Sequence, residues 1–136
     1  MLTWSPSFAI GVPEIDDQHR TLFERAGRFA AAVHGHERSA RLAELFDFLS
    51  EYALEHFASE ERLMRSVDYP DIERHAVEHR SFRGRLGSLA PQWDWEGESS
   101  AMLLALLGFL DAWLTEHVRG SDQRLAIFLR ARRPVR

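Results

Sequence analysis

The stretch YALEHFASEERLMR, residues 52–65, has the apolar period of a helix but places two polar residues inside that period. Apolar side chains recur at steps of three and four residues, which is typical of an amphipathic helix. His56 and Glu60 stand four residues apart on this stripe, so they point within about 40° of each other toward the face that should be buried. Glu61 lies about 140° from His56 and is predicted to point away. The stretch therefore predicts a helix that turns an imidazole and a carboxylate toward the core.

The same apolar period predicts further helices along the chain. The long ones cover residues 15–33, 42–63, 72–89 and 103–117. A short tail helix is expected over residues 122–133, after an interruption at Gly120. Long helices joined by short connections predict an all-α fold, an up-down-up-down four-helix bundle with a short C-terminal tail helix.

Capping and turn residues predict where these helices begin and end. Asp16 and Asp17 are expected to cap free N–H groups at the start of the first helix. The segments HGHE, around Gly35, and SVDYPD indicate turns, with Pro70 in the first turn of the next helix. The segment APQWDWEGESS, residues 90–100, is predicted to be a loop from its Pro, Gly and Ser content.

The composition is that of one globular domain spanning residues 1–136. The net charge of −4 does not support nucleic-acid binding, and no apolar run is long enough to cross a bilayer. The chain has no Cys, which excludes disulfides and thiolate ligands. The N-terminal residues lack the pattern of a signal peptide, so we expect a cytoplasmic protein, and a monomer.

The polar residues inside the apolar stripes all fall at one end of the predicted bundle. In an antiparallel bundle the starts of the first and third helices lie beside the ends of the second and fourth. The residues concerned are His19, His56, Glu60, His75, His79 and His117. His34 and His36 belong to the opposite end and are expected to be solvent-exposed.

A metal site explains this group better than ordinary core packing does. A single buried histidine is usually a hydrogen-bonded core residue, and a single glutamate on a stripe usually reaches water. Six such residues at one level cannot all find hydrogen-bond partners in this way, because crowded imidazoles compete for few acceptors. A buried carboxylate also costs several kcal/mol, roughly, in desolvation free energy. Neutral imidazoles and carboxylates are metal ligands, so we interpret the group as a metal site.

Four segments carry a resemblance to a known family. They are IDDQH (15–19), HFASEERLM (56–64), YPDIERHAVEH (69–79) and WLTEHVRGSD (113–122). Together they resemble the motifs of the hemerythrin family, in its bacterial single-domain form, and Trp4 and Gly11 fit the same pattern. The resemblance covers nearly the whole chain. It implies a non-haem di-iron protein that binds O2 reversibly, for storage or delivery, and that is not an enzyme.

The resemblance also implies which residues bind the metal. To the six residues found from the apolar pattern it adds Asp122, five residues after His117. One iron is expected on His75, His79 and His117, and the other on His19 and His56. Glu60, Asp122 and an oxo or hydroxo group are expected to bridge the two irons. Asp16 is a further candidate for orienting a ligand.

Counting these ligands leaves one open position, on the iron that has two histidines, where we expect O2 to bind. The expected apolar neighbours of that position are Leu114, Trp113, Phe23 and Val118. Ordinary core packing is an equally good interpretation of these four residues.

Other functions remain open on the sequence. A sensor of oxygen, nitric oxide or redox state would need a partner protein, for which the candidate surfaces are Trp93, Trp95 and the arginines of the tail, Arg130, Arg132, Arg133 and Arg136. A di-iron oxidase, peroxidase or nitric-oxide-reducing enzyme is a second alternative. Zinc or manganese could also occupy such a site, because the residue types alone do not select iron.

Overall fold

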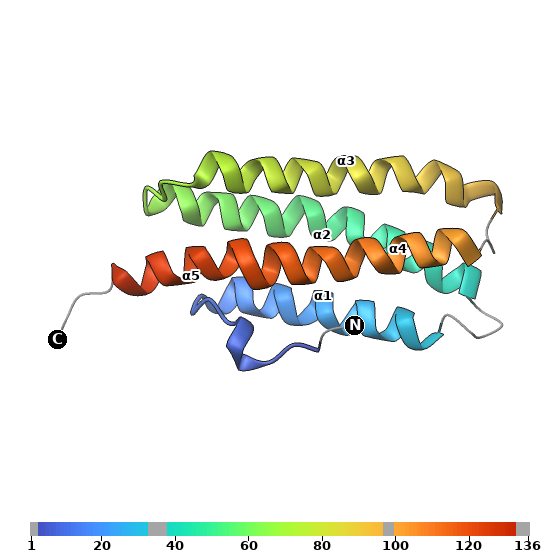
Figure 1. Cartoon of the computed structure of the whole chain (residues 1–136), viewed down its shortest axis with the longest axis horizontal. Coiled ribbons are helices and arrows are strands. Elements are labelled where there is room, and N and C mark those ends of the chain that lie inside the picture. Colours follow the sequence, from blue (N-terminus) through green and yellow to red (C-terminus); the bar gives the residue numbers. More distant parts are fainter. Residues whose placement is uncertain (1–2, 33–37, 97–99, 133–136) are drawn as a thin grey trace.

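The computed structural model describes residues 3–32, 38–96 and 100–132, and all regular structure in these residues is helical. The elements are the 3₁₀ turn η1 (Pro6–Phe8), α1 (Pro13–Ala32), α2 (Arg38–Ser66), α3 (Ile72–Glu96), α4 (Ser100–Trp113), the π-helical segment η2 (Leu114–Ser121) and α5 (Asp122–Ala131). Figure 1 shows α4 and α5 as one continuous rod that lies alongside α1, α2 and α3. Each of α1 and α3 packs against both α2 and α4. The prediction of an all-α four-helix bundle is confirmed.

The turn between α2 and α3 ends α2 with two backbone hydrogen bonds. The N–H of Tyr69 donates to the carbonyl of Met64 (3.0 Å), and the N–H of Asp68 donates to that of Arg65 (3.3 Å). Asp68 has φ 52°, the left-handed conformation that this kind of helix end requires. The predicted turn is confirmed, but Pro70 precedes α3 and does not lie in its first turn, because the helix begins at Ile72.

Two predicted interruptions are wrong. The loop predicted over residues 90–100 is helical as far as Glu96, so Trp93 and Trp95 lie on helical backbone. Pro91 costs this helix one backbone hydrogen bond, and the surrounding turns outweigh that local cost. The chain also stays helical across Gly120, because glycine permits a break without imposing one.

The segment before α1 is held by Asp16. Its carboxylate accepts hydrogen bonds from the N–H groups of Ile10 (2.8 Å) and Gly11 (3.3 Å), and Gly11 has φ 88°. Asp16 therefore fixes the chain that leads into the helix, and the prediction that it caps the N–H groups of the helix itself is wrong. The Asp17 carboxylate accepts from Arg20 (2.6 Å) on the surface.

The bundle has two hydrophobic clusters with a polar layer between them. The larger cluster fills most of the interior and includes Phe23, Phe57 and Leu110. The smaller one, with Ile15, Met64 and Leu125 among its members, closes the end of the bundle near the turn between α2 and α3. The polar layer is therefore shielded from water on both sides, which strengthens every electrostatic interaction in it.

Two further features concern the outside of the bundle. Among the described residues, no helix is both long enough and apolar enough to span a membrane. In the arginine-rich tail, Arg130 donates to the carbonyl of Ala9 (3.3 Å) and Arg132 donates to that of Val67, so both side chains contact the bundle. His34, His36, Arg133 and Arg136 lie outside the described residues, as do the side chains of Trp93 and Trp95.

Candidate metal centre

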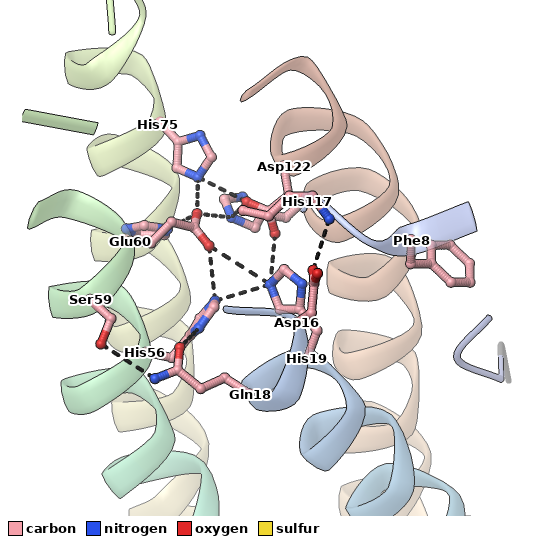
Figure 2. Close-up of polar contacts among 12 residues, drawn as sticks. Phe8, Asp16, Gln18, His19, His56, Ser59, Glu60, His75, His117 and Asp122 are labelled. Atoms are coloured by element: carbon pink, nitrogen blue, oxygen red, sulfur yellow. Dashed lines mark hydrogen bonds and ion pairs between the residues drawn. The ribbon is translucent and has the colours of Figure 1, made fainter. Parts of the chain in front are cut away.

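Seven polar side chains meet in the polar layer, and each is at most 2% exposed. They are His19, His56, Glu60, His75, His79, His117 and Asp122. Figure 2 shows Glu60 and Asp122 between the histidines of the neighbouring helices. The structure thus brings together all the residues that the sequence singled out as ligands.

The geometry of a single helix places four of the seven in two pairs. His56 and Glu60 on α2, and His75 and His79 on α3, are each four residues apart, so each pair shares one helix face. His19 on α1 faces them from the opposite side of the layer, with its Nε2 3.1 Å from Nε2 of His56. The four-residue spacing seen in the sequence therefore predicts the two pairs, whereas the position of His19 against them depends on how α1 packs on α2.

Asp122 reaches the layer through the π-helical segment η2. Five residues along a regular α-helix would turn Asp122 about 140° away from His117. In η2 the N–H of Asp122 instead donates to the carbonyl of His117, a five-residue hydrogen bond that brings residues five apart onto nearly the same face. A Cβ added at Gly120 would meet nothing closer than an Arg124 side-chain atom at 4.0 Å, so no close contact requires glycine there. The wider helical turn, and not a bend at Gly120, delivers the second carboxylate.

The two carboxylates divide the cluster into two halves. Oε1 of Glu60 and Oδ1 of Asp122 face the three-histidine half, formed by His75, His79 and His117. In that half Oε1 of Glu60 contacts Nε2 of His75 and lies 3.2 Å from Nε2 of His79. Oδ1 of Asp122 lies 3.0 Å from Nε2 of His75 and 3.2 Å from Nε2 of His117.

The other oxygen of each carboxylate faces the two-histidine half, formed by His19 and His56. Oε2 of Glu60 lies 3.0 Å from Nε2 of His56, and Oδ2 of Asp122 lies 3.1 Å from Nε2 of His19. Each carboxylate therefore presents one oxygen to each half, which is the arrangement that two bridging ligands need.

The charges in this cluster depend on one another. Burial alone would lower the pKa of His19 and of His75, but the adjacent carboxylates of Asp122 and Glu60 raise both to about 9. Burial also opposes charge on His117, yet Asp122 raises its pKa well above the ordinary value. The carboxylates respond in the opposite direction: burial would raise the pKa of Glu60, but its histidine neighbours, His56 first, lower it strongly. Without a metal ion, the raised pKa values favour imidazolium at His19, His75 and His117 beside the carboxylates, whereas burial lowers the pKa of His56.

Several buried atoms of the cluster nevertheless lack a hydrogen bond of good geometry among the described residues. They are Oε2 of Glu60, both carboxylate oxygens of Asp122, Nε2 of His117 and Nδ1 of His19. Buried polar atoms without partners are rare and costly. In each half, candidate ligand atoms from four residues lie within 4.8 Å of one another. Nitrogen and oxygen donors converging in this way fit two metal ions that share Glu60.

The outer nitrogens of three histidines have partners that the sequence analysis missed. Nδ1 of His56 contacts Oε1 of Gln18 (2.6 Å), and Nδ1 of His79 contacts Oε2 of Glu61 (2.9 Å). Nδ1 of His117 contacts Oε1 of Glu78 (3.2 Å). Each contact fixes the ring and leaves Nε2 free to bind a metal, and an acceptor on Nδ1 also makes the imidazole a stronger ligand.

A sequence signal for these partners exists, although it is weak. Gln18, Glu61 and Glu78 each stand next to another cluster residue along the chain, and each contacts a histidine of a neighbouring helix. The Ser121 hydroxyl donates a bifurcated hydrogen bond to the two carboxylate oxygens of Glu78 (2.7 and 2.8 Å). These contacts and that of His117 lower the pKa of Glu78 to about 2 against the effect of burial, so Glu78 stays ionised.

We expect Glu61→Ala to weaken metal binding in the three-histidine half by about 10- to 100-fold without abolishing it. Glu61 is not a member of the cluster, but its carboxylate contacts Nδ1 of His79 and orients that ring. Competition with a chelator of known affinity would measure the change. Glu55→Ala, at an exposed position of the same helix, is the matched control and should leave the affinity unchanged.

The four residues predicted to surround bound O2 are all buried. Leu114 and Val118 are fully buried, and Phe23 and Trp113 are nearly so, in the same hydrophobic cluster. Trp113 stacks on His117, with ring centroids 3.9 Å apart and planes at 10°, so it belongs beside the three-histidine half.

Two aromatic residues that the sequence analysis did not assign to the site also stack on histidines. Phe57 lies parallel to His79, with centroids 4.0 Å apart, and Tyr52 lies nearly parallel to His56, with centroids 4.8 Å apart. Aromatic rings therefore close the inner side of both halves against water.

The fold and the site define a class: a helical bundle whose buried histidines and carboxylates form a cation-binding centre. The family model described as the hemerythrin HHE cation binding domain matches residues 10–128. The chain belongs to the hemerythrin family.

Curated relatives agree with this assignment. A bacteriohemerythrin of Stenotrophomonas maltophilia is 32% identical over 93% of this chain and 80% of its own length. A bacteriohemerythrin of Clostridium acetobutylicum is 27% identical over 90% of this chain and 97% of its own. A myohemerythrin of Riftia pachyptila is 29% identical over 88% of this chain and 86% of its own.

Proposed function

We propose that this chain is a hemerythrin-type di-iron protein that binds O2 reversibly, for storage or delivery. The observation that carries the proposal is the two-sided cluster, in which Glu60 and Asp122 each present one oxygen to each half. Membership of the hemerythrin family supports iron as the metal.

In this proposal every cluster residue has a defined part. His75, His79 and His117 hold one iron, and His19 and His56 hold the other. Glu60 and Asp122 would each offer one oxygen to each iron. An iron pair held in this way would supply the electrons for reversible O2 binding, which we propose occurs at the two-histidine half.

The protein supplies shielding and orientation. The hydrophobic clusters on both sides of the layer exclude water, and Leu114, Val118, Phe23 and Trp113 belong to the larger one. Gln18, Glu61 and Glu78 hold three of the ligand rings. Reversible binding of O2 needs no catalytic acid, base or nucleophile. We therefore propose a binding protein and not an enzyme. We further propose that the chain acts as a cytoplasmic monomer.

The experiment that tests this function is an absorption spectrum of the iron-loaded protein. The protein is reduced without air, exposed to O2 and then returned to argon, and metal analysis of the same sample separates iron from zinc or manganese. We expect a visible band that appears with O2 and disappears under argon over repeated cycles. Rapid, irreversible oxidation without such a band would contradict reversible binding and favour a redox sensor or an enzyme.

A further inference from the structure

Tyr52 forms a wall of the two-histidine half. It lies one helical turn before His56 on α2, and its ring stacks on that imidazole at an interplanar angle of 17°. The side chain is 6% exposed. Phe23 on α1, Tyr52 on α2 and Leu114 in η2 each lie about one helical turn from a cluster histidine, and all three belong to the large hydrophobic cluster.

The hydroxyl group of Tyr52 is buried and has no hydrogen-bond partner among the described residues. Burial raises the pKa of Tyr52 well above its ordinary value, and the charges of Asp122 and Glu60 raise it further, so the phenol keeps its proton. A buried phenol without an acceptor is costly, because a polar group removed from water needs a partner. Tyr52 is thus a hydrogen-bond donor held in place without an acceptor.

The surroundings of Tyr52 provide no acceptor of their own. Its ring neighbours include Phe48 and Phe57, with centroids 5.8 and 6.2 Å away. The two nitrogens of His56 are already engaged, Nδ1 by Gln18 and Nε2 by the cluster. An acceptor for the phenol must therefore come from outside the described side chains, and the stacking of Tyr52 on His56 makes the two-histidine half the nearest site that could hold a ligand with one.

We infer that the Tyr52 hydroxyl donates a hydrogen bond to a small ligand with an acceptor atom, O2 or a small anion, bound at the two-histidine half. This inference rests on the proposed function, because it needs a metal ion in that half. The hydrogen bond gives Tyr52 the role of a positioning residue that slows release of the ligand. Ligands without an acceptor atom gain nothing from it.

The chain contains two tyrosines, which provides a matched pair of variants. Tyr52→Phe removes the proposed donor and keeps the ring that stacks on His56. Tyr69→Phe removes the same atom from the smaller hydrophobic cluster, where Tyr69 packs edge-on against Phe128. Azide is the probe for the oxidised, iron-loaded protein, and O2 is the probe for the reduced one.

We expect azide and O2 to leave Tyr52→Phe about tenfold faster than the wild type, the effect of losing one hydrogen bond. Tyr69→Phe should release both at the wild-type rate. Equal release rates in Tyr52→Phe and wild type, or failure of the iron-loaded wild type to bind azide, would overturn the inference. The two proposals can fail separately. If azide leaves Tyr52→Phe faster than the wild type but the wild type does not bind O2 reversibly, the proposed function is contradicted and the role of Tyr52 is supported.

Two readouts do not depend on ligand release. In the Tyr69→Phe variant, Tyr52 is the remaining tyrosine. An infrared difference spectrum of this variant, prepared with ring-labelled tyrosine, therefore reports on Tyr52 alone. The tyrosine band should shift when azide binds. In the metal-free protein, Tyr52→Phe should unfold at the same urea concentration as the wild type or at a higher one. The substitution removes a hydroxyl group that makes no hydrogen bond with the described residues, so no stabilising contact is lost. An unshifted band, or a clearly lower midpoint that reveals a structural hydrogen bond, would overturn the inference.

Discussion

Replacing Glu60 with alanine is expected to abolish the binding of both metal ions, lowering the metal content from about two ions per chain to almost none. Glu60 has one oxygen in each half of the cluster, so its loss removes a ligand from both sites at once. Metal analysis after dialysis of the iron-loaded variant measures the effect.

Two further variants separate this effect from a failure to fold. Glu60→Gln keeps the size of the side chain, and helical content measured by circular dichroism shows whether either variant folds. Glu55→Ala removes an exposed carboxylate five residues earlier on α2 and should keep both ions. A folded Glu60→Ala protein that still holds two ions would refute the assignment of Glu60 as the shared ligand.

The metal-free protein is expected to lose stability as the pH rises from about 6.5 to 9. The pKa values of His19 and His75 are raised to about 9 in the folded protein, whereas an unfolded histidine has its ordinary value near 6.5. The stabilisation from these two groups is complete below pH 6.5 and is lost as the pH passes through 9. The loss in the free energy of unfolding should be of the order of 5 kcal/mol.

Other shifted groups do not reverse this trend. Burial lowers the pKa of His56, which makes stability rise with pH, but that rise ends near pH 6.5. The pKa of Glu78 is about 2, so its contribution is complete above its ordinary, unfolded value near 4.5 and constant at neutral pH. Bound metal needs neutral imidazoles, so metal affinity should increase over the same range in which the metal-free protein weakens.

Urea unfolding of the chelator-treated protein at a series of pH values tests this expectation. Asp122→Asn should flatten the decline, because it removes a carboxylate that raises the pKa of both His19 and His75. A free energy of unfolding that is constant or rises between pH 6.5 and 9 would show that the histidines are not protonated in the metal-free cluster.

The sequence by itself determined the helices and most of the cluster. The apolar period and the four-residue spacing of His56 with Glu60, and of His75 with His79, depend on the geometry of a single helix. That geometry is local, so the residues within one helix are sufficient to predict which side chains share a face. The resemblance to the hemerythrin family then supplied Asp122, which the period of a regular helix would have placed elsewhere.

Only the tertiary structure decided how these residues are held. Three features depend on the folded chain: the π-helical turn that brings Asp122 beside His117, and the contacts of Gln18 and of Glu61 with histidines of neighbouring helices. The burial of the Tyr52 hydroxyl, without a partner among the described residues, also follows from how the helices pack. The extension of α3 through Pro91 is another case, since turn-forming residues indicate only a local preference. Contacts between helices depend on their separation and rotation, and no spacing within a single helix contains that information.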